Sequence, residues 1–473
     1  MIRLGKVLSW SYIVFTPRNE YEAWLSGLTL AQVSNMLGDN GCSEAFVKSL
    51  SSNDNSKQQI YLASDLAQIS KIPFGDPISS KVMSNKPNAA GKVKFQSSVN
   101  FDWITPIGPR EAPQAKLIYY PQYPEVRFSG FLADCDDPPS WLLNRELRGA
   151  ELGRTLILAP TGTGRVWGLV LPTESSAGKE LNSLRLDKYG LLSVWRLSTP
   201  KQSEVQPTIF SALCEISSKG FVDSMRLDKN GNKQEYNKQN GGGYTLEALL
   251  GIKPNGDSRP DYQGWEVKQH GVTNLDRAAT GKVTMFTPEP DGGSYVGSVE
   301  SFLRCHGTRT SDSNRIDFSH IYKCPQGWNE TTGLRLTVVG YTRGQLVSDQ
   351  GQIVLEHKTG EVAASWSFEK LLGHWTRKHA KAVFVPSLSQ TPSNGVRQYR
   401  YGSSVIEGID ATFTKFLDAV SDGTIYYDPA VNMKRSAEGE KWSIKRRNQF
   451  RTDLKTISAI YKSVRLVEVC NEA

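Results

Sequence analysis

A short acidic motif with a lysine constrains the fold of this 473-residue chain more than any other feature. Asp261, Glu266 and Lys268 are spaced D-x4-E-x-K, and Glu247 lies upstream of them. Side chains two residues apart on a β-strand share one face, so Glu266 and Lys268 would point the same way while their neighbours take the opposite, apolar face. The motif therefore predicts a strand with an acid and an ammonium group on one face and Asp261 at its entrance.

These side chains suit the hydrolysis of a phosphodiester. That reaction needs one or two hard cations to activate water and to neutralise charge on the phosphate oxygens, so carboxylates must converge on one point. A lysine beside them can stabilise the attacking hydroxide or the developing negative charge. The candidate catalytic residues are Glu247, Asp261, Glu266 and Lys268, and the three acids are candidate metal ligands. The alternative is a solvated hairpin in which the aspartate starts a turn and the other side chains face water.

A short helix is expected around Glu247. The residue follows a glycine-rich run and Thr245, which we interpret as the N-cap, and Gly251 would end the helix. A helix packed beside the strand would bring the Glu247 carboxylate to the same cation.

Several segments around the motif match a known family. They are Thr245-Leu246-Glu247, Leu250-Gly251-Ile252, Pro254-Asn255-Gly256, Pro260-Asp261, Gly264-Trp265-Glu266-Val267-Lys268 and Met285-Phe286-Thr287-Pro288-Glu289-Pro290. In these segments the chain resembles the MvaI/BcnI family of restriction endonucleases, a branch of the PD-(D/E)xK nucleases related to the mismatch-repair nickase MutH. The resemblance extends from about Pro207 towards the C-terminus.

The resemblance implies a fold, an activity and roles for the motif. The fold would be a mixed central β-sheet flanked by helices, and the activity would be Mg²⁺-dependent hydrolysis of double-stranded DNA to 5′-phosphate and 3′-hydroxyl ends, with Mn²⁺ as a substitute. Asp261 and Glu266 would hold the metal, Lys268 would position or activate water, and Glu247 would complete the metal shell. Family members act as monomers, and a companion methyltransferase or a partner protein of a phage-defence system is a further partner that such an enzyme could have.

The length of the chain predicts more than one domain. A polar interval from Ser198 to Gln206 separates an N-terminal accessory region, residues 1–205, from a nuclease domain, residues 206–473. The accessory region mixes helical periodicity with β-like stretches, including a hairpin at 161–164, and could divide near residue 100. The expected class is α/β (α+β): a PD-(D/E)xK-like core preceded by an α+β, partly β-rich region with a DNA-recognition or regulatory role.

The charge of the chain favours a polyanionic partner. The net charge is +8 and the pI is near 9.0, and lysine and arginine gain free energy by releasing counterions from phosphate backbones. Basic runs at 377–381, 397–402 and 441–451 follow the motif. The candidate DNA contacts are His270, Arg377, Lys378, Arg397, Arg400, Lys445, Arg446, Arg447 and Arg451. Asn448 and Gln449 carry amides that can pair with adenine. The alternative for each run is a solvated face.

The cysteines and the N-terminus bear on the compartment. The six cysteines form no CxxC pair, which argues against a zinc ribbon and a disulfide framework and favours a reducing cytoplasm. Residues 1–15 are interpreted as a first strand or buried segment, not as a signal peptide. No apolar stretch is long enough to cross a bilayer, so no membrane association is expected.

Two other functions stay open at this stage. The chain could be a non-catalytic DNA-binding or assembly subunit of a defence system that keeps the motif as a relic. It could also be a nuclease with the same core that acts on RNA or on single strands, because a metal site of this kind does not distinguish the sugar.

Overall fold

A computed structural model describes residues 16–50, 59–83, 91–144, 147, 153–197, 207–253, 261–310, 314–435 and 441–472. The expectations for residues 1–15, for the turn at 254–256, for Pro260 and for a boundary between 205 and 206 lie outside this part of the chain. No helix in the described residues has the length and apolar character needed to span a membrane.

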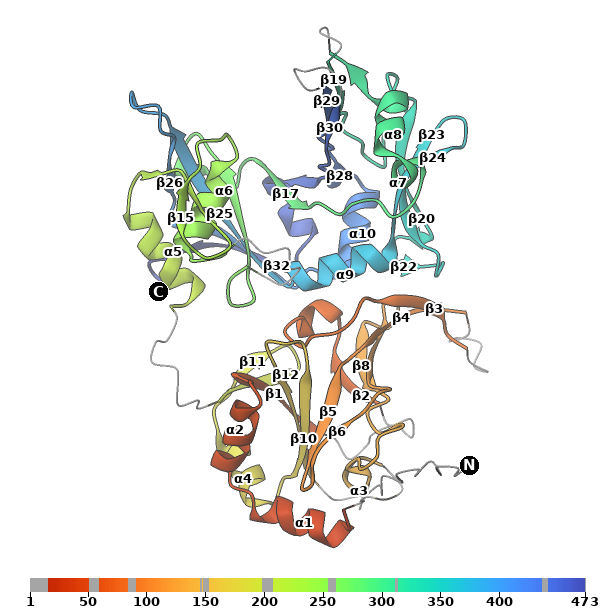
Figure 1. Cartoon of the computed structure of the whole chain (residues 1–473), viewed down its shortest axis with the longest axis vertical. Coiled ribbons are helices and arrows are strands. Elements are labelled where there is room, and N and C mark those ends of the chain that lie inside the picture. Colours follow the sequence, from red (N-terminus) through yellow and green to blue (C-terminus); the bar gives the residue numbers. More distant parts are fainter. Residues whose placement is uncertain are drawn as a thin grey trace, which may run out of the picture.

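Two β-sheets organise the N-terminal region, which we define as residues 16–197 (Figure 1). One sheet has seven strands in the order β11-β12-β1-β9-β10-β5-β6, and the other has five in the order β2-β8-β7-β4-β3. Strands from both sides of residue 100 share each sheet. The strands β9 and β10 pair antiparallel across the turn at 161–164, so the hairpin expected there is confirmed.

The elements of this region have the following bounds: α1 (Arg18–Gly27), α2 (Leu30–Asp39), β1 (Glu44–Leu50), β2 (Ile60–Ala63), η1 (Leu66–Ile69), β3 (Ile78–Lys81), β4 (Val93–Ser98), β5 (Phe101–Thr105), β6 (Gly108–Glu111), β7 (Lys116–Tyr120), β8 (Glu125–Ser129), α3 (Ser140–Leu143), β9 (Arg154–Pro160), β10 (Val166–Pro172), α4 (Ser176–Ser183), β11 (Asp187–Tyr189) and β12 (Leu192–Arg196).

The C-terminal region, residues 207–472, forms two lobes with β17 (Lys282–Phe286) running between them (Figure 1). The first lobe holds a sheet in the order β13-β26-β25-β27-β32, with β16 beside β25. Its elements are α5 (Ile209–Ser218), β13 (Val222–Asp223), β14 (Met225–Leu227), β15 (Lys233–Glu235), α6 (Gly241–Leu249), β16 (Glu266–Gly271), η2 (Leu275–Arg277), β25 (Lys381–Gln390), β26 (Gln398–Tyr401), β27 (Ser404–Ile409) and β32 (Ser463–Glu468). Because β16 is parallel to β25 and the other pairs are antiparallel, the sheet is mixed.

Small sheets and helices build the second lobe. Its elements are α7 (Ser294–Gly297), α8 (Val299–His306), β18 (Thr308–Arg309), β19 (Arg315–Phe318), β20 (Leu334–Val339), β21 (Tyr341–Thr342), β22 (Gln345–Leu346), β23 (Gln352–His357), β24 (Val362–Ser367), α9 (Phe368–Lys378), α10 (Phe413–Ser421), β28 (Ile425–Tyr427), β29 (Val431–Arg435), β30 (Trp442–Lys445), β31 (Phe450–Asp453) and η3 (Leu454–Ala459). The expected fold class, with a mixed sheet flanked by helices and a β-rich N-terminal region, is confirmed.

The helix expected around Glu247 is present but begins earlier than predicted. The helix α6 starts at Gly241 after the N-cap Asn240, so the glycine-rich run belongs to the helix and the N-cap assignment of Thr245 is wrong. The Thr245 hydroxyl instead accepts from Met225 N at 3.0 Å, which ties α6 to β14. The helix ends as expected: Gly251 has a φ of 73° and follows the C-cap residue.

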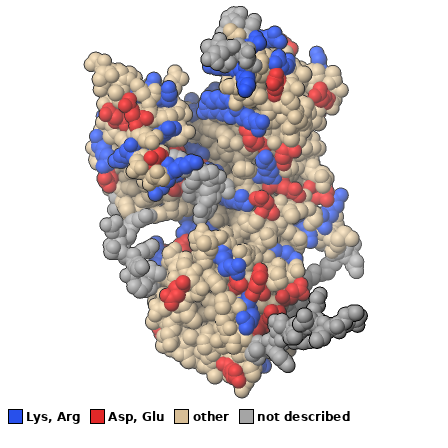
Figure 2. Space-filling model, viewed as in Figure 1, with Lys and Arg blue, Asp and Glu red and all other residues tan. Residues whose placement is uncertain are grey.

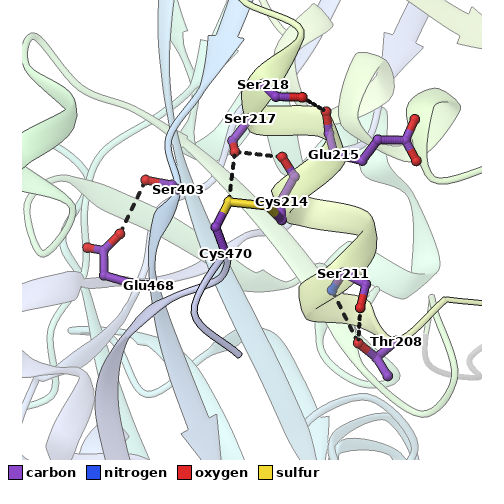
Figure 3. The surroundings of a disulfide bond; sticks show 9 residues. All are labelled: Thr208, Ser211, Cys214, Glu215, Ser217, Ser218, Ser403, Glu468 and Cys470. Atoms are coloured by element: carbon purple, nitrogen blue, oxygen red, sulfur yellow. Dashed lines mark hydrogen bonds between the residues drawn. A yellow bond between two sulfur atoms is a disulfide. The ribbon is translucent and has the colours of Figure 1, made fainter. Parts of the chain in front are cut away.

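One disulfide links the two ends of the first lobe. Cys214 of α5 bonds to Cys470, which follows β32, and their Cα atoms are 4.9 Å apart (Figure 3). The local spacing of the cysteines did not predict this bond because the partners are 256 residues apart in the sequence. Disulfides are rare in reducing compartments, so the bond weakens the argument for a reducing cytoplasm. The other four cysteines are free.

Candidate active site

The four candidate catalytic residues open on one cleft of about 700 Å³. Glu247 comes from α6, Asp261 from the segment before β16, and Glu266 and Lys268 from β16 itself. The helix and the strand lie against each other, so the sequence motif and the upstream glutamate are brought together in space.

A tight turn positions Asp261. Tyr262 N donates to Trp265 O at 3.0 Å and Trp265 N donates to Tyr262 O at 2.8 Å. The two residues between them have φ values of 47° and 87°, the left-handed pair typical of a two-residue turn. The turn folds Asp261 back on the strand, where its Oδ2 accepts from Val267 N at 3.1 Å.

Glu266 is the most deeply buried acid of the site, with 1% of its surface exposed. Its Oε1 accepts a hydrogen bond from Lys268 Nζ and lies 3.8 Å from Lys378 Nζ. Its Oε2 is buried and has no hydrogen-bond partner among the described residues. A buried carboxylate oxygen without a partner is costly, so this atom calls for a ligand from outside the chain.

The electrostatics of the cleft favour a cation. Burial, followed by the charge of Asp261, raises the pKa of Glu247 to about 7, and burial together with Glu266 raises that of Asp261 to about 6. Burial acts in the same direction on the pKa of Glu266, but the charges of Lys268, Lys378 and His379 lower it overall. Burial acts to lower the pKa of Lys268, but Glu266 and the other acids raise it. Lys268 is therefore protonated at neutral pH, and two of the three acids carry charge at a cost that a metal ion would relieve.

The residues fit a magnesium ion held by few protein ligands. No group of three or more His, Cys, Asp or Glu side chains is arranged to hold a metal within the described ranges. Mg²⁺, however, usually binds through one or two carboxylates and completes its shell with waters and substrate phosphates. Asp261 and the unpaired Oε2 of Glu266 suit that kind of site, and Glu247 faces the same cleft.

Lys378 is a site residue whose position the sequence analysis did not foresee. We expected it to contact DNA, but its ammonium group lies at Glu266 and it lines the cleft together with His374, also from α9. Glu266 pairs with Ala382 in the parallel register of β16 and β25. The basic run just before β25 must therefore end near Glu266, and a prediction of that parallel pairing could have revealed the contact.

The opposite wall of the cleft is basic. Arg447 and Arg451 line it from the second lobe, and Lys445 and Arg446 are exposed beside them. Figure 2 shows Lys and Arg gathered where the two lobes face each other. Of these four residues, Arg451 also donates to Asp428 Oδ2 at 2.7 Å. The run at 441–451 thus faces the same opening as the acidic motif.

Of the other candidate DNA contacts, His270 lies at the cleft wall, and Arg377, Arg397 and Arg400 lie outside the cleft. Arg397 and Arg400 are on or beside β26, and Arg400 lines a separate cavity. Arg377 pairs with Asp76 of the N-terminal region at 2.6 Å. His270 is buried at the cleft wall and its Nε2 lies 2.8 Å from Ala278 O. Burial lowers the pKa of His270 to about 4, so its ring is neutral at neutral pH.

Asn448 and Gln449 do not reach the cleft surface. Asn448 is fully buried, and its amide nitrogen donates to Glu289 and Tyr295, each at 2.9 Å. Gln449 is 6% exposed and donates to Asp428 O at 3.1 Å. These partners within the protein do not support the expectation that the two amides pair with bases.

Comparisons with known proteins give one family. The family model described as "MvaI/BcnI restriction endonuclease family" matches residues 210–461, more than half of the chain. A solved restriction endonuclease MvaI–cognate DNA substrate complex is similar at 16% identity over 55% of this chain and 96% of that one, with a TM-score of 0.43. MvaI in the absence of DNA is similar at 15% identity over 57% and 100%, with a TM-score of 0.32. No curated protein matches the chain.

Proposed function

The chain belongs to the MvaI/BcnI restriction endonuclease family, and we propose that it is a metal-dependent endonuclease that hydrolyses phosphodiester bonds of double-stranded DNA to 5′-phosphate and 3′-hydroxyl ends. One observation carries the proposal. Glu247, Asp261, Glu266 and Lys268 open on a single cleft, and one buried carboxylate oxygen there has no protein partner among the described residues.

Each residue of the motif has a role in this proposal. Asp261 and Glu266 hold Mg²⁺, for which Mn²⁺ can substitute, and Glu247 completes the surroundings of the ion. When bound, the metal supplies Lewis-acid activation of water and neutralises charge on the scissile phosphate. Lys268, kept protonated beside Glu266, stabilises negative charge on the attacking oxygen and on the phosphate. A protonated lysine acts through its charge and its hydrogen bonds, not as a general base.

The basic side chains of the second lobe would bind the DNA substrate. The side chains of Arg447 and Arg451 line the cleft across from the acids, and a duplex between the lobes would exchange counterions for these cations. Lys445 and Arg446 would extend the same contact along the phosphate backbone. Arg397 and Arg400 would contact DNA at the margin of this surface, and His270 would do so at the cleft wall.

The wider context is also part of the proposal. Residues 206–473 form the nuclease domain, and residues 1–205 form an accessory region with a recognition or regulatory role. The enzyme works as a monomer in the cytoplasm, in a restriction or phage-defence system that can include a companion methyltransferase.

A plasmid assay tests the proposed function. Supercoiled DNA is incubated with the protein and Mg²⁺, Mn²⁺ or a chelator, and the ends of the products are sequenced. We expect nicked or linear DNA with 5′-phosphate ends only when metal is present. A shift in DNA mobility without nicks would instead support a binding or assembly subunit, and preferential cutting of RNA or single strands would support a nuclease with another substrate.

A further inference from the structure

The helix α9 connects the active site to the N-terminal region. Its C-terminal end carries Lys378, whose ammonium group lies at Glu266, and His374, which lines the cleft. Its apolar side chains are buried in a core cluster that includes residues of both regions, and the helix packs against η1 of the N-terminal region as well as against β24 and α10. Glu369, Gly373 and Arg377 are spaced four residues apart, so they lie along one side of the helix and form a third face.

The first turn of this face is anchored by Glu369. Its Oε1 accepts from Ser79 N at 2.6 Å and lies 2.7 Å from Ser79 Oγ, whose one hydrogen is shared with Asp349 O at 2.6 Å. Both Ser79 groups belong to β3 of the N-terminal region, 290 residues away in the sequence. A carboxylate that accepts from a partly buried backbone N–H makes a charge-assisted bond, which is stronger than a neutral one.

The next two turns rest on the residues just before Ser79. A Cβ atom added at Gly373 would lie 3.3 Å from Pro77 Cδ, so the helix and the segment approach closely there. Arg377 NH2 lies 2.6 Å from Asp76 Oδ1, but the Asp76 side chain is 88% exposed. An exposed ion pair contributes little, whereas Glu369 binds a partly buried backbone N–H of the N-terminal region.

The N-terminal region also contacts the segment that leads into β16. Lys71 lies beside Gly264, with its Cε 3.3 Å from the position of an added Cβ atom. Lys381 Nζ lies 5.9 Å from the ring centroid of Tyr189 and 5.6 Å from that of Trp265. The N-terminal region therefore contacts both segments that meet at Glu266, the start of β16 and the end of α9.

We infer that the N-terminal region positions the active site through α9, with Glu369 as the positioning residue that holds Lys378 at Glu266. Lys378 lies nine residues after Glu369, or roughly 13 Å along the helix. A tilt of about 5° at the anchor would displace the end of the helix by roughly 1 Å, and a misplacement of about that size can reduce the rate of a reaction up to 100-fold. This inference rests on the proposed function for its kinetic consequences.

Steady-state cleavage by the full chain tests the inference. Glu369→Ala is expected to lower kcat about tenfold and to leave KM unchanged, because the substrate still binds while Lys378 is misplaced. Glu369→Gln should restore most of the loss, since its amide oxygen can accept the hydrogen bond from Ser79 N. The matched control is Glu356→Ala, which removes a glutamate of β23 that pairs with Arg335 of β20. The kcat of this control variant is expected to equal that of the wild type. Wild-type kcat in Glu369→Ala would overturn the inference.

A double-mutant cycle shows whether Glu369 acts through Lys378. If it does, Glu369→Ala combined with Lys378→Ala should have the same kcat as Lys378→Ala alone, to within about twofold. Losses that multiply would show that Glu369 acts by another route and would overturn the inference.

Hydrogen exchange separates the inference from the proposed function because it requires no DNA. In Glu369→Ala the amides of α9 should exchange faster while those of β9 and β10 keep their protection. Faster exchange in α9 of a protein that never cuts DNA would contradict the proposed function and support the anchor. Unchanged exchange in α9 would contradict the anchor even if the wild-type protein cuts DNA.

Discussion

Two polar clusters in the C-terminal region differ in how their atoms are satisfied. In the first, at the cleft, the acids Glu247, Asp261 and Glu266 lie together and Glu266 Oε2 has no partner among the described residues. In the second, inside the second lobe, the amide nitrogen of Asn448 donates to Glu289 and Tyr295 at 2.9 Å. Each member of the second cluster therefore has a partner within the cluster.

The two clusters therefore differ in role: the second cluster stabilises the fold, and the cleft cluster serves the proposed function. In the second cluster Tyr427 OH donates to Asn448 Oδ1 at 2.6 Å and Tyr295 OH donates to Glu289 Oε2 at 2.9 Å. Such a network fixes one arrangement of the core. In the cleft cluster the like charges and the unpaired oxygen cost free energy that a bound cation would return. Both clusters combine buried and half-buried polar residues, so satisfaction of their hydrogen bonds distinguishes the clusters better than burial.

The largest effect is expected from the cleft cluster. Lys268→Ala removes the charge next to the reacting phosphate, so kcat should fall about 100- to 1000-fold, while binding to duplex DNA in chelator stays as in the wild type. The measurements are plasmid nicking and a mobility shift. The control is Lys358→Ala, which removes an exposed lysine from the turn between β23 and β24. Full activity of Lys268→Ala would remove this residue from the mechanism.

A change in the second cluster should alter stability and leave the chemistry intact. Asn448→Ala leaves Tyr427 OH and a Glu289 oxygen without their partner, so the free energy of unfolding should fall by about 2–3 kcal/mol. Urea denaturation measures the loss, and kcat should stay within about twofold of the wild type. Unchanged stability together with altered cleavage sites would mean that Asn448 contacts DNA after all.

The pH dependence of stability should differ between the clusters. Burial and Asp261 raise the pKa of Glu247 to about 7 in the folded state, against about 4.3 in an unfolded chain. The stabilisation by this group is therefore complete below about pH 4 and is lost as the pH rises to 7. The free energy of unfolding, measured in chelator, should fall between pH 5 and pH 8 in the wild type. In Glu247→Gln this fall should be smaller than in the wild type by about 1–2 kcal/mol, after allowance for partial solvent screening. An identical fall in both proteins would show that this carboxylate is not destabilised by its surroundings.

The smallest effect is the stabilisation by metal. Mg²⁺ at about ten times its Kd should stabilise the wild type by roughly 1.4 kcal/mol, a rise of about 1–2 °C in Tm for a chain of this size. The shift should persist in Asn448→Ala and vanish in Glu266→Gln, which lacks the charge of the unpaired oxygen. Differential scanning fluorimetry with Mg²⁺ and with chelator measures it. A shift that survives Glu266→Gln would place the cation elsewhere.

The sequence predicted the features that depend on residues lying close together along the chain. The D-x4-E-x-K motif, the strand that carries Glu266 and Lys268 and the helix around Glu247 could all be inferred because each involves neighbouring residues. The position of Lys378 at Glu266 depends on the parallel pairing of β16 with β25, which no local pattern reveals. The basic run at 441–451 was correctly noticed, but only the fold shows that Arg447 faces the cleft while Asn448 points into the core.

Contacts between distant segments account for the other differences. The disulfide joins residues 256 apart, and the anchor of α9 joins residues 290 apart. The Thr245 hydroxyl resembled an N-cap in the sequence because threonine suits that position, but tertiary contact with Met225 uses it inside the helix.

Anomalous diffraction from crystals soaked in Mn²⁺ tests the central claim most directly. We expect a peak within about 2.0–2.2 Å of Glu266 Oε2 and an Asp261 oxygen, with the ammonium group of Lys268 close by. Absence of any peak in the cleft of an actively cleaving protein, or a peak bound by neither Asp261 nor Glu266, would contradict it.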